Sequence, residues 1–361
     1  MQLERKRRSS TRAAALVLAS AAALSACSAA HDESLATKQV EAPTTADVAN
    51  PMASFARMVP GEWRVTATRG TSTFDTWHWG PGERSMRVMT DGLDSAVVPK
   101  PWRELQVFYW HPGREQVCML GLSPYASGVW EGTIEFDGES ATGVADLYQT
   151  HGRRKLGLRW TFEGPDHYRD ALLEATGPAG FGPLAEWEHF RSEGPPAPRT
   201  PIVEEEVPTP SKNLKPFEVL LGRTWQAEGE WTNGERFHTE TTFEWIPYAE
   251  GIYARTVEVA KDGERVHLLD AYVFHHTGTG ALRCLALSKS GGVHEGDWTE
   301  LDDGALQLDL TCYEDDRVGR RVVRLDFEQD GTLRDRMWSA VGTDLELLLD
   351  VVLAPSDRPR D

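Results

Sequence analysis

A tryptophan–histidine–tryptophan run at residues 77–79 is the local sequence of this chain best suited to bind a ligand. On a strand, successive side chains point to opposite faces, so Trp77 and Trp79 share one face and His78 takes the other. Tryptophans that face inward would line a pocket for a flat or sugar-like ligand. The alternative, which we favour, is that both rings pack in a core beside the turn at Gly80 and Pro81.

Two glutamates occupy the same place in a repeated motif. Residues 128–132 read Gly-Val-Trp-Glu-Gly, and residues 292–296 read Gly-Val-His-Glu-Gly. If Glu131 and Glu295 face inward, either carboxylate is able to bind a ligand or to act as a general acid or base. Glutamates flanked by glycines at a strand start are more often solvated, so exposure to solvent is the favoured alternative.

Two arginine–aspartate pairs, at 169–170 and 334–335, lie at equivalent places in the chain. On a strand, one member of each pair should face inward. A buried arginine needs an acidic partner or an anionic ligand, so Arg169 and Arg334 are the polar pocket residues that we prefer. The alternative is a cross-strand salt bridge on the outer face, which the residue types favour.

Motifs for catalysis and for metal binding are missing from the sequence. His275 and His276 are adjacent and point to opposite faces of a strand, so they cannot chelate one ion, and no zinc-like spacing lies nearby. We expect these histidines, and His111, which echoes His275 before a turn, to be exposed at turn edges. The chain has no nucleophile elbow, zincin helix, phosphate loop or dinucleotide fingerprint. We therefore predict no metal and no catalytic residue, and an enzyme stays only the weaker alternative.

The elements that position these residues come in two copies. Residues 55–63 return as 217–225, residues 76–79 as 242–245, and residues 108–111 as 272–275, with an offset that stays between 162 and 166. Trp245 is therefore the counterpart of Trp79 and a further candidate ligand contact. A period this long exceeds the roughly 20–50 residues of solenoids and propellers, so the repeat indicates two tandem domains.

Period-two alternation predicts the fold of each copy. Residues 257–259, 306–310 and 323–327 alternate between apolar and polar side chains, and turn dipeptides such as Asp262-Gly263 separate such runs. We count about ten strands and no long amphipathic helix. Closing ten antiparallel strands into a barrel removes exposed edges. The sequence therefore predicts an all-β fold of two tandem antiparallel up-and-down β-barrels, at residues 51–192 and 213–356.

The remaining segments carry signals of export and flexibility. Residues 1–26 have a basic start, a short apolar run and the sequence Leu-Ser-Ala before Cys27, which resembles a bacterial lipoprotein signal with Cys27 as the lipidated residue. An ordinary signal peptide is the alternative. Residues 27–50 form an expected flexible tether, 193–212 a linker rich in proline and glutamate, and 357–361 a tail. We expect the protein to be exported and lipid-anchored to the cell envelope.

Composition limits the partners and the cysteine chemistry. The signal holds five basic residues and one acidic residue, so its removal takes the formal charge from −18 to −22. Such an acidic chain is repelled by nucleic acid, which we exclude as a partner. The cysteines other than Cys27 are Cys118, Cys284 and Cys312. We expect buried thiols, because one strand should separate Cys284 from Cys312, beyond the reach of a disulfide.

The start of the second copy resembles a known family. Residues 220–225, Leu-Leu-Gly-Arg-Thr-Trp, followed by Gly-Glu at 229–230, are similar to the opening of nitrobindin-like and other lipocalin-like barrels, and residues 337–342 are similar too. The resemblance covers nearly all of each copy in outline. It implies a barrel of about ten strands with an internal cavity for a small apolar or planar ligand.

The same resemblance bears on cofactors. Nitrobindin-type proteins hold haem through a histidine on or near the final strand. Here residues 343–349 contain no histidine, and His189 of the first copy comes several residues later than the motif would place it. We therefore expect no cofactor.

These observations lead to one expected function and two alternatives. We expect an envelope-anchored lipoprotein whose barrels bind a small apolar or planar ligand. The first copy is the better site, because it holds more glycine and tryptophan, whereas Leu306, Leu308 and Leu310 look set to fill the second. The first alternative is a non-catalytic module with filled barrels that binds another envelope protein. The weaker alternative is an enzyme with a pocket in the first domain.

Overall fold

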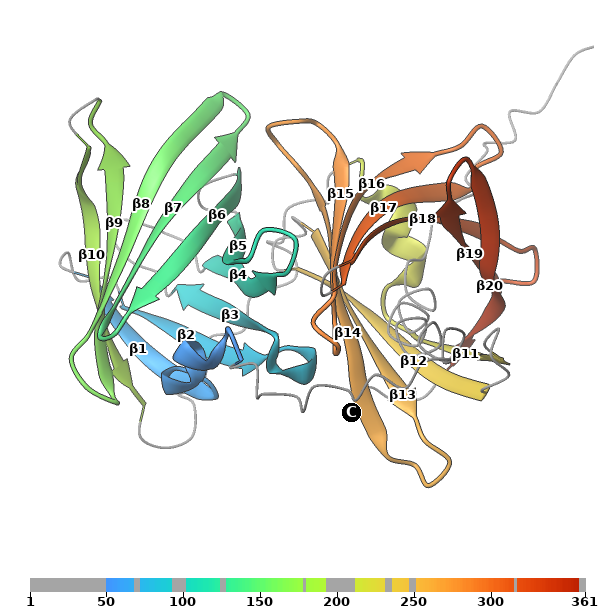
Figure 1. The fold of residues 1–361 in the computed structure, drawn as a ribbon, viewed down its shortest axis with the longest axis horizontal. Helices are drawn as coiled ribbons and strands as arrows, with labels where there is room; N and C mark the ends of the chain where they lie inside the picture. Colours follow the sequence, from blue (N-terminus) through green and yellow to red (C-terminus); the bar gives the residue numbers. More distant parts are fainter. Residues whose placement is uncertain are drawn as a thin grey trace, which may run out of the picture.

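The computed structural model describes residues 50–67, 72–92, 102–123, 128–177, 180–192, 212–230, 236–246, 251–314 and 317–356. These residues form two closed β-barrels, each with ten antiparallel strands. Figure 1 shows the barrels side by side, the first in blue to green and the second in yellow to red. The predicted all-β fold of two tandem up-and-down barrels is confirmed.

The first barrel follows a short 3-10 helix, η2 (Ala53–Arg57), and contains a second one, η3 (Pro81–Glu83). Each strand pairs with its neighbours in sequence, and β1 closes the barrel against β10. The strands are β1 (Gly61–Ala67), β2 (Ser72–Trp79), β3 (Ser85–Gly92), β4 (Trp102–His111), β5 (Gln116–Ser123), β6 (Gly128–Asp137), β7 (Ser140–Gln149), β8 (Gly152–Phe162), β9 (His167–Ala175) and β10 (Phe181–Arg191).

The second barrel repeats this order after a 3-10 helix, η5 (Lys215–Leu220), and closes by pairing β11 with β20. Its strands are β11 (Thr224–Glu230), β12 (Arg236–Trp245), β13 (Gly251–Val259), β14 (Arg265–His275), β15 (Leu282–Ser288), β16 (Val293–Glu300), β17 (Leu306–Glu314), β18 (Arg317–Phe327), β19 (Leu333–Val341) and β20 (Asp344–Ser356). The turn that joins β13 to β14 contains Gly263 at φ +89°, a conformation that glycine adopts without strain.

One end of each barrel is closed by the 3-10 helix that precedes its first strand. Phe55 of η2 and Phe217 of η5 are buried inside their barrels. The indole of Trp63 donates to the carbonyl of Met58 at 3.2 Å, and the indole of Trp225 donates to that of Leu220 at 3.1 Å. Both copies of the repeated segment therefore build the same plug, and we call the opposite end of each barrel, which has no such helix among the described residues, its open end.

The interiors of the two barrels differ. The second is filled with aliphatic side chains, among them Leu306, Leu308 and Leu310, as the sequence predicted. The first has an aromatic layer next to its plug, where Trp77 lies 6.0 Å from both Phe108 and Trp160, centroid to centroid. Such packing stabilises the closed end of the first barrel. We call this layer the aromatic floor of the first barrel.

Among the described residues, Cys118, Cys284 and Cys312 are free and buried, as expected. Cys284 on β15 and Cys312 on β17 face the interior of the second barrel with β16 between them. Burial raises the pKa of both thiols to about 12, so neither is a reactive thiolate at neutral pH.

Several predicted segments lie wholly or almost wholly outside the described residues. These are the signal at 1–26 with Cys27, the tether at 27–50 except for Asn50, the linker at 193–212 except for Lys212, and the tail at 357–361. Among the helices that the structure describes, none has the length and apolar character needed to cross a bilayer.

Candidate functional site

The repeated Gly-Val-x-Glu-Gly motif forms the seam between the two barrels. Outward-facing apolar side chains of β4, β5 and β6 pack against those of β14, β15 and β16 in one cluster, which we call the seam. Figure 1 shows these strands on the facing sides of the two barrels. Its buried members are Leu105, Val107, Tyr109, Cys118, Leu120, Leu122 and Val129 from the first barrel and Ile246, Tyr272, Phe274, Leu285, Leu287 and Val293 from the second. The barrels are therefore joined by a shared hydrophobic core rather than by the linker alone.

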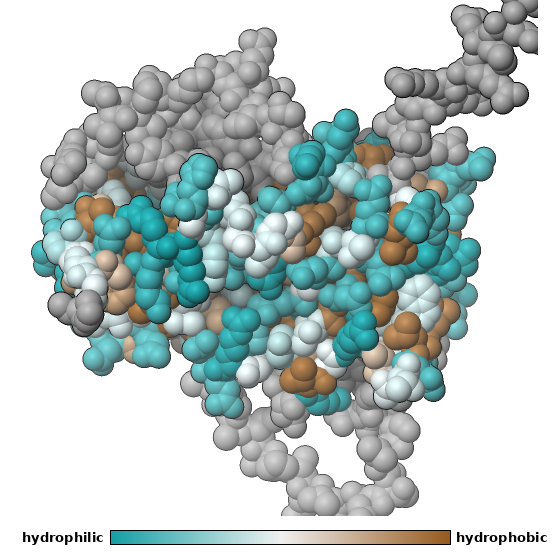
Figure 2. All heavy atoms as spheres, turned by 90° about the horizontal axis from the view of Figure 1, so that it is seen from above, coloured by the Kyte–Doolittle hydropathy of each residue, from teal (hydrophilic) through white to brown (hydrophobic). Residues whose placement is uncertain are grey.

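Figure 2 views the molecule from above and shows mostly hydrophilic residues over the coloured surface of that face. The hydrophobic residues there lie in small separate groups, which is ordinary for a protein surface.

The two glutamates of the motif point across the seam to residues on the outer face of the opposite barrel. Glu131 accepts a hydrogen bond from Arg283 at 2.8 Å and lies 3.5 Å from Nε2 of His276. Glu131 and Glu295 were expected to be solvated, and His276 to be exposed. The structure corrects this expectation for His276, which is buried. The side chain of Glu131 stays 33 % exposed beside its charged partner, and that of Glu295 is 14 % exposed.

Glu295 makes the equivalent contacts in the other direction. It accepts from Arg114 at 2.9 Å and from the hydroxyl of Tyr109 at 3.3 Å, and it lies 3.7 Å from Nε2 of His111. Burial alone would raise the pKa of Glu295, but the hydrogen bond from His111 and the charge of Arg114 hold it below its usual value. His111 is fully buried rather than exposed, because the tyrosine ring of Tyr313 covers it at 4.5 Å.

The seam has approximate twofold symmetry. The His111–Tyr313 ring contact recurs as His276–Tyr148, with centroids 4.7 Å apart. The cavity beside the two glutamates measures about 50 Å³, which is room for a water molecule or two and not for an organic ligand. The seam is therefore a structural joint, and the charged hydrogen bonds of Glu131 and Glu295 stabilise it.

Replacing Glu295 by Gln should loosen this joint. The variant keeps the shape of the side chain but removes the negative charge that lies beside Arg114 and His111. We therefore expect the free energy of unfolding to fall by about 1–3 kcal/mol. Urea denaturation measures this loss, and Glu131→Gln should lose a similar amount. Glu300→Gln, an exposed change on the same strand as Glu295, is the control. A Glu295 variant as stable as this control would contradict the role.

A cluster of ionisable side chains lies inside the first barrel, above the aromatic floor. Asp75 on β2 and His189 on β10 are both 5 % exposed, and Nδ1 of His189 lies 3.1 Å from the carboxylate of Asp75. Asp170 on β9 faces the same space, because it pairs across the sheet with the inward-facing Trp160. Glu104 on β4 completes the cluster and accepts from Gln106 at 2.7 Å. Sequence analysis missed this group, because its members come from four distant strands.

The carboxylates of this cluster outnumber its cations. The pKa of Asp170 is raised from 3.8 to about 6, because burial and the charge of Asp75 raise it more than the charge of His189 lowers it. Burial also raises the pKa of Glu104. One oxygen of Asp75 and one of Asp170 have no hydrogen-bond partner, and neither does Nε2 of His189. The first barrel therefore holds unsatisfied acceptors in a partly dry interior, which is costly unless a ligand supplies the donors.

Aromatic rings surround this polar cluster. Tyr168 stacks on His189 with ring centroids 4.1 Å apart. Trp187, which is half-buried, pairs across the sheet with Asp170 and so faces the same interior. Trp77 and Trp79 also point inward; Trp77 is buried in the floor, and Trp79 packs against the same core. Trp77 is therefore packed in the core, as the favoured alternative predicted. A direct contact of Trp77 or Trp79 with a ligand stays a prediction.

The arginines named from sequence lie on the outer faces of the barrels. Arg334 pairs with Asp350 through two hydrogen bonds of 2.7 and 2.6 Å. Arg169 forms an ion pair with Glu163. The preferred inward orientation was therefore wrong for both, and the salt-bridge alternative holds. Their neighbours Asp170 and Asp335 take the inward positions instead, because adjacent residues of a strand face opposite sides.

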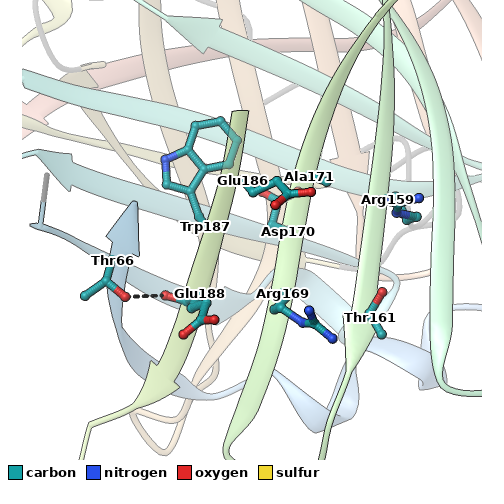
Figure 3. Close-up of a pocket in the computed structure, with 9 residues that line it drawn as sticks. All are labelled: Thr66, Arg159, Thr161, Arg169, Asp170, Ala171, Glu186, Trp187 and Glu188. Carbon is teal, nitrogen blue, oxygen red and sulfur yellow. Dashed lines mark hydrogen bonds between the residues drawn. The ribbon is translucent and has the colours of Figure 1, made fainter. Parts of the chain in front are cut away.

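Arg169 also lines a groove of about 550 Å³ that opens on β8, β9 and β10. Figure 3 shows Arg169 between Glu188 and Thr161, and the strand register places the three side chains in one row on the outer face. Glu186 and Arg159 form a second row beside it (Figure 3). Charges of both signs alternate along the groove, which makes it a polar surface feature and not an apolar ligand pocket.

The second barrel lacks the carboxylate cluster. The cross-strand register gives Thr241 in place of Asp75, Leu269 in place of Glu104 and Leu353 in place of His189. Asp335 keeps the place of Asp170 and is fully buried. Trp245, the counterpart of Trp79, is half-buried against the aliphatic core. Its role as a ligand contact is a prediction without further support from the structure.

The surroundings of His189 do not fit a haem. His189 lies on the last strand of its barrel and faces inward, but Tyr168 covers one face of the ring and Asp75 takes Nδ1. Asp170 adds a further acid group, and this acidic environment disfavours a macrocycle that itself carries carboxylates. That the protein binds no haem stays a prediction, which an absorbance titration with haem would check.

Comparisons with known proteins add little to this picture. No family model and no curated protein matches the sequence. The crystal structure of Rv2717c from M. tuberculosis is similar at 17% identity over 41% of this chain and 99% of that one, with a TM-score of 0.30. A Bacteroides eggerthii structure named "Bifunctional GH43-CE" aligns over 80% of this chain and 49% of that one, at 10% identity and a TM-score of 0.11. At such low TM-scores neither similarity bears on function.

Proposed function

We propose that the protein is an exported, lipid-anchored member of the lipocalin-like barrel proteins, and that its first barrel binds a small planar ligand that carries a basic nitrogen. The observation that carries this proposal is the set of unsatisfied acceptors on Asp75 and Asp170 inside that barrel. A buried carboxylate is destabilising unless a cation or donor pairs with it. A protonated amine or amidine supplies both.

The walls of the first barrel support the same ligand class. Tyr168 and Trp187 lie beside the carboxylates. Aromatic faces attract cations and pack against flat rings, so such walls suit a planar ligand with a positive charge. The second barrel has aliphatic side chains at most of the equivalent positions and serves mainly as a support.

The anchor is the other part of the proposal. The lipoprotein-like signal before Cys27 supports lipidation, and the expected tether would hold both barrels outside the cytoplasm as a receptor for a ligand present there. Mass spectrometry of the protein from a membrane fraction checks this point, since a lipidated Cys27 gains the mass of its acyl chains. A mature chain that begins elsewhere would contradict it.

A binding test of the soluble chain without residues 1–27 checks the ligand class. Native mass spectrometry and an absorbance scan first show whether a ligand is already bound. We then expect tryptophan fluorescence to report binding of a planar amine, such as a benzamidine, and not of benzoate. Asp75→Asn and Asp170→Asn should each weaken amine binding by about 10-fold or more, the loss of one charged partner.

Asp344→Asn, an exposed carboxylate of the second barrel, is the matched control and should bind the amine as the wild type does. A clean apo mass together with no binding of any amine would contradict the proposal. That outcome would favour the alternative of a filled module that binds another envelope protein, for which the outer groove at Arg169 is the first surface to test.

A further inference from the structure

A second set of buried polar side chains lies at the open end of the second barrel. His294 on β16 is fully buried, and neither of its ring nitrogens has a hydrogen-bond partner. Arg321 on β18 is 8 % exposed; its Nη2 lies 3.2 Å from Glu314, and its Nη1 has no partner. Both face the interior, because they pair across the sheet with the core residues Cys312 and Leu310.

These residues are absent from the first barrel. The motif that reads Gly-Val-His-Glu-Gly at 292–296 has Trp130 in place of His294, and the strand register puts Leu156 in place of Arg321. The first barrel thus places aromatic and aliphatic groups where the second places two hydrogen-bond donors. This difference does not involve the carboxylate cluster of the first barrel. It lies at the open end of the second barrel.

We infer that the open end of the second barrel binds a small carboxylate anion, which accepts hydrogen bonds from Nη1 of Arg321 and from a ring N–H of His294. A buried guanidinium with one free donor needs an acceptor, and Glu314 satisfies only its other nitrogen. Carboxylates match the planar geometry of arginine and pair with it strongly.

The depth of the site limits the size of the anion. Val323 and Met337 lie one layer nearer the plug than Arg321 and are fully buried. We expect this packed layer to exclude a long acyl chain. Acetate or another short organic acid therefore fits, and a fatty acid of ten carbons does not.

His294 acts here as a neutral donor. Burial and the nearby charge of Arg321 lower its pKa to about 3, so the ring carries one N–H at neutral pH. Gly292 borders the ring: a Cβ atom added there would lie 3.3 Å from Nε2 of His294 and 2.9 Å from Oγ of Ser288. A side chain at position 292 would therefore crowd the imidazole.

Calorimetric titration of the soluble chain with sodium acetate tests the inference. We expect saturable binding of acetate and no binding of decanoate. Arg321→Gln should weaken acetate binding by about 10-fold or more, and His294→Phe by several-fold, in line with the loss of a charged and a neutral hydrogen bond. Arg320→Gln is the matched control, because Arg320 is the neighbouring arginine on the same strand and is exposed.

A direct readout in the wild type covers the case in which a variant does not fold. The ring nitrogens of His294, labelled with ¹⁵N, should shift in the NMR spectrum as acetate is added, because neither has a hydrogen-bond partner in the protein. Asp170→Asn should leave acetate binding unchanged, which separates this site from the one in the first barrel. No acetate-dependent shift of His294, or equal acetate affinity in Arg321→Gln and wild type, would overturn the inference.

Discussion

Replacing Asp170 by Asn is expected to raise the free energy of unfolding at pH 7 by up to about 3 kcal/mol while weakening the proposed amine binding. The pKa of Asp170 rises from 3.8 to about 6 in the folded protein, mainly through burial. Each pKa unit corresponds to about 1.4 kcal/mol. At pH 7 the folded state therefore carries an ionised carboxylate in an unfavourable place, and the amide of Asn removes that cost because it needs no charge.

The effect of Asp170 on the free energy of unfolding also has a definite direction with pH. Between pH 3.8 and about 6 the folded state holds the proton of Asp170 more tightly than the unfolded state does. The wild type should therefore lose stability as the pH rises through this window, and Asp170→Asn should not. Urea denaturation at pH 4, 5, 6 and 7 measures the difference, with Asp344→Asn as an exposed control. A variant that is no more stable than the wild type at pH 7 would show that Asp170 is already satisfied without a ligand.

Acid should destabilise the second barrel through His294. The pKa of this histidine falls from 6.5 to about 3 on folding, because burial and Arg321 disfavour its charged form. Below pH 6.5 the unfolded state takes up a proton that the folded state refuses, so stability falls as the pH drops toward 3. The full shift corresponds to roughly 4–5 kcal/mol.

The variant His294→Phe isolates this contribution. It fills a similar volume and cannot be protonated, so its stability relative to the wild type should rise by several kcal/mol between pH 6.5 and pH 3. His151→Phe, a change at an exposed turn, should leave the acid sensitivity as it is. If the free energy of unfolding depended on pH in the same way in His294→Phe and in the wild type, the ring would be protonated in the folded state.

Asp170 and His294 act in opposite directions over overlapping ranges of pH. Each is a group that the folded protein keeps in an unfavourable environment, and each lies in a different barrel. Natural proteins retain such strain mainly at functional sites, where it is relieved by a ligand. The pH dependence of stability at Asp170 and at His294 therefore tests the two proposed binding sites separately.

Sequence patterns predicted the architecture because the architecture depends on local and repeated features. Alternation with period two fixes which face of a strand is buried, and turn dipeptides mark where strands end. The repeat of residues 55–63 at 217–225 corresponds to the same helix-and-tryptophan plug in both barrels. The interior of the second barrel was also predictable, because Leu306, Leu308 and Leu310 alternate within a single strand.

The sequence alone determined the all-β fold, the duplication and the free thiols, since each depends on spacing along one stretch of chain. Only the tertiary structure decided what the polar residues do. It turned Glu131 and Glu295 into the charged contacts of the seam, because packing of one barrel on the other replaced the expected solvent. It also gathered Asp75, Glu104, Asp170 and His189 from four strands. Barrel closure brings such residues together, and no local pattern records which inward positions will meet.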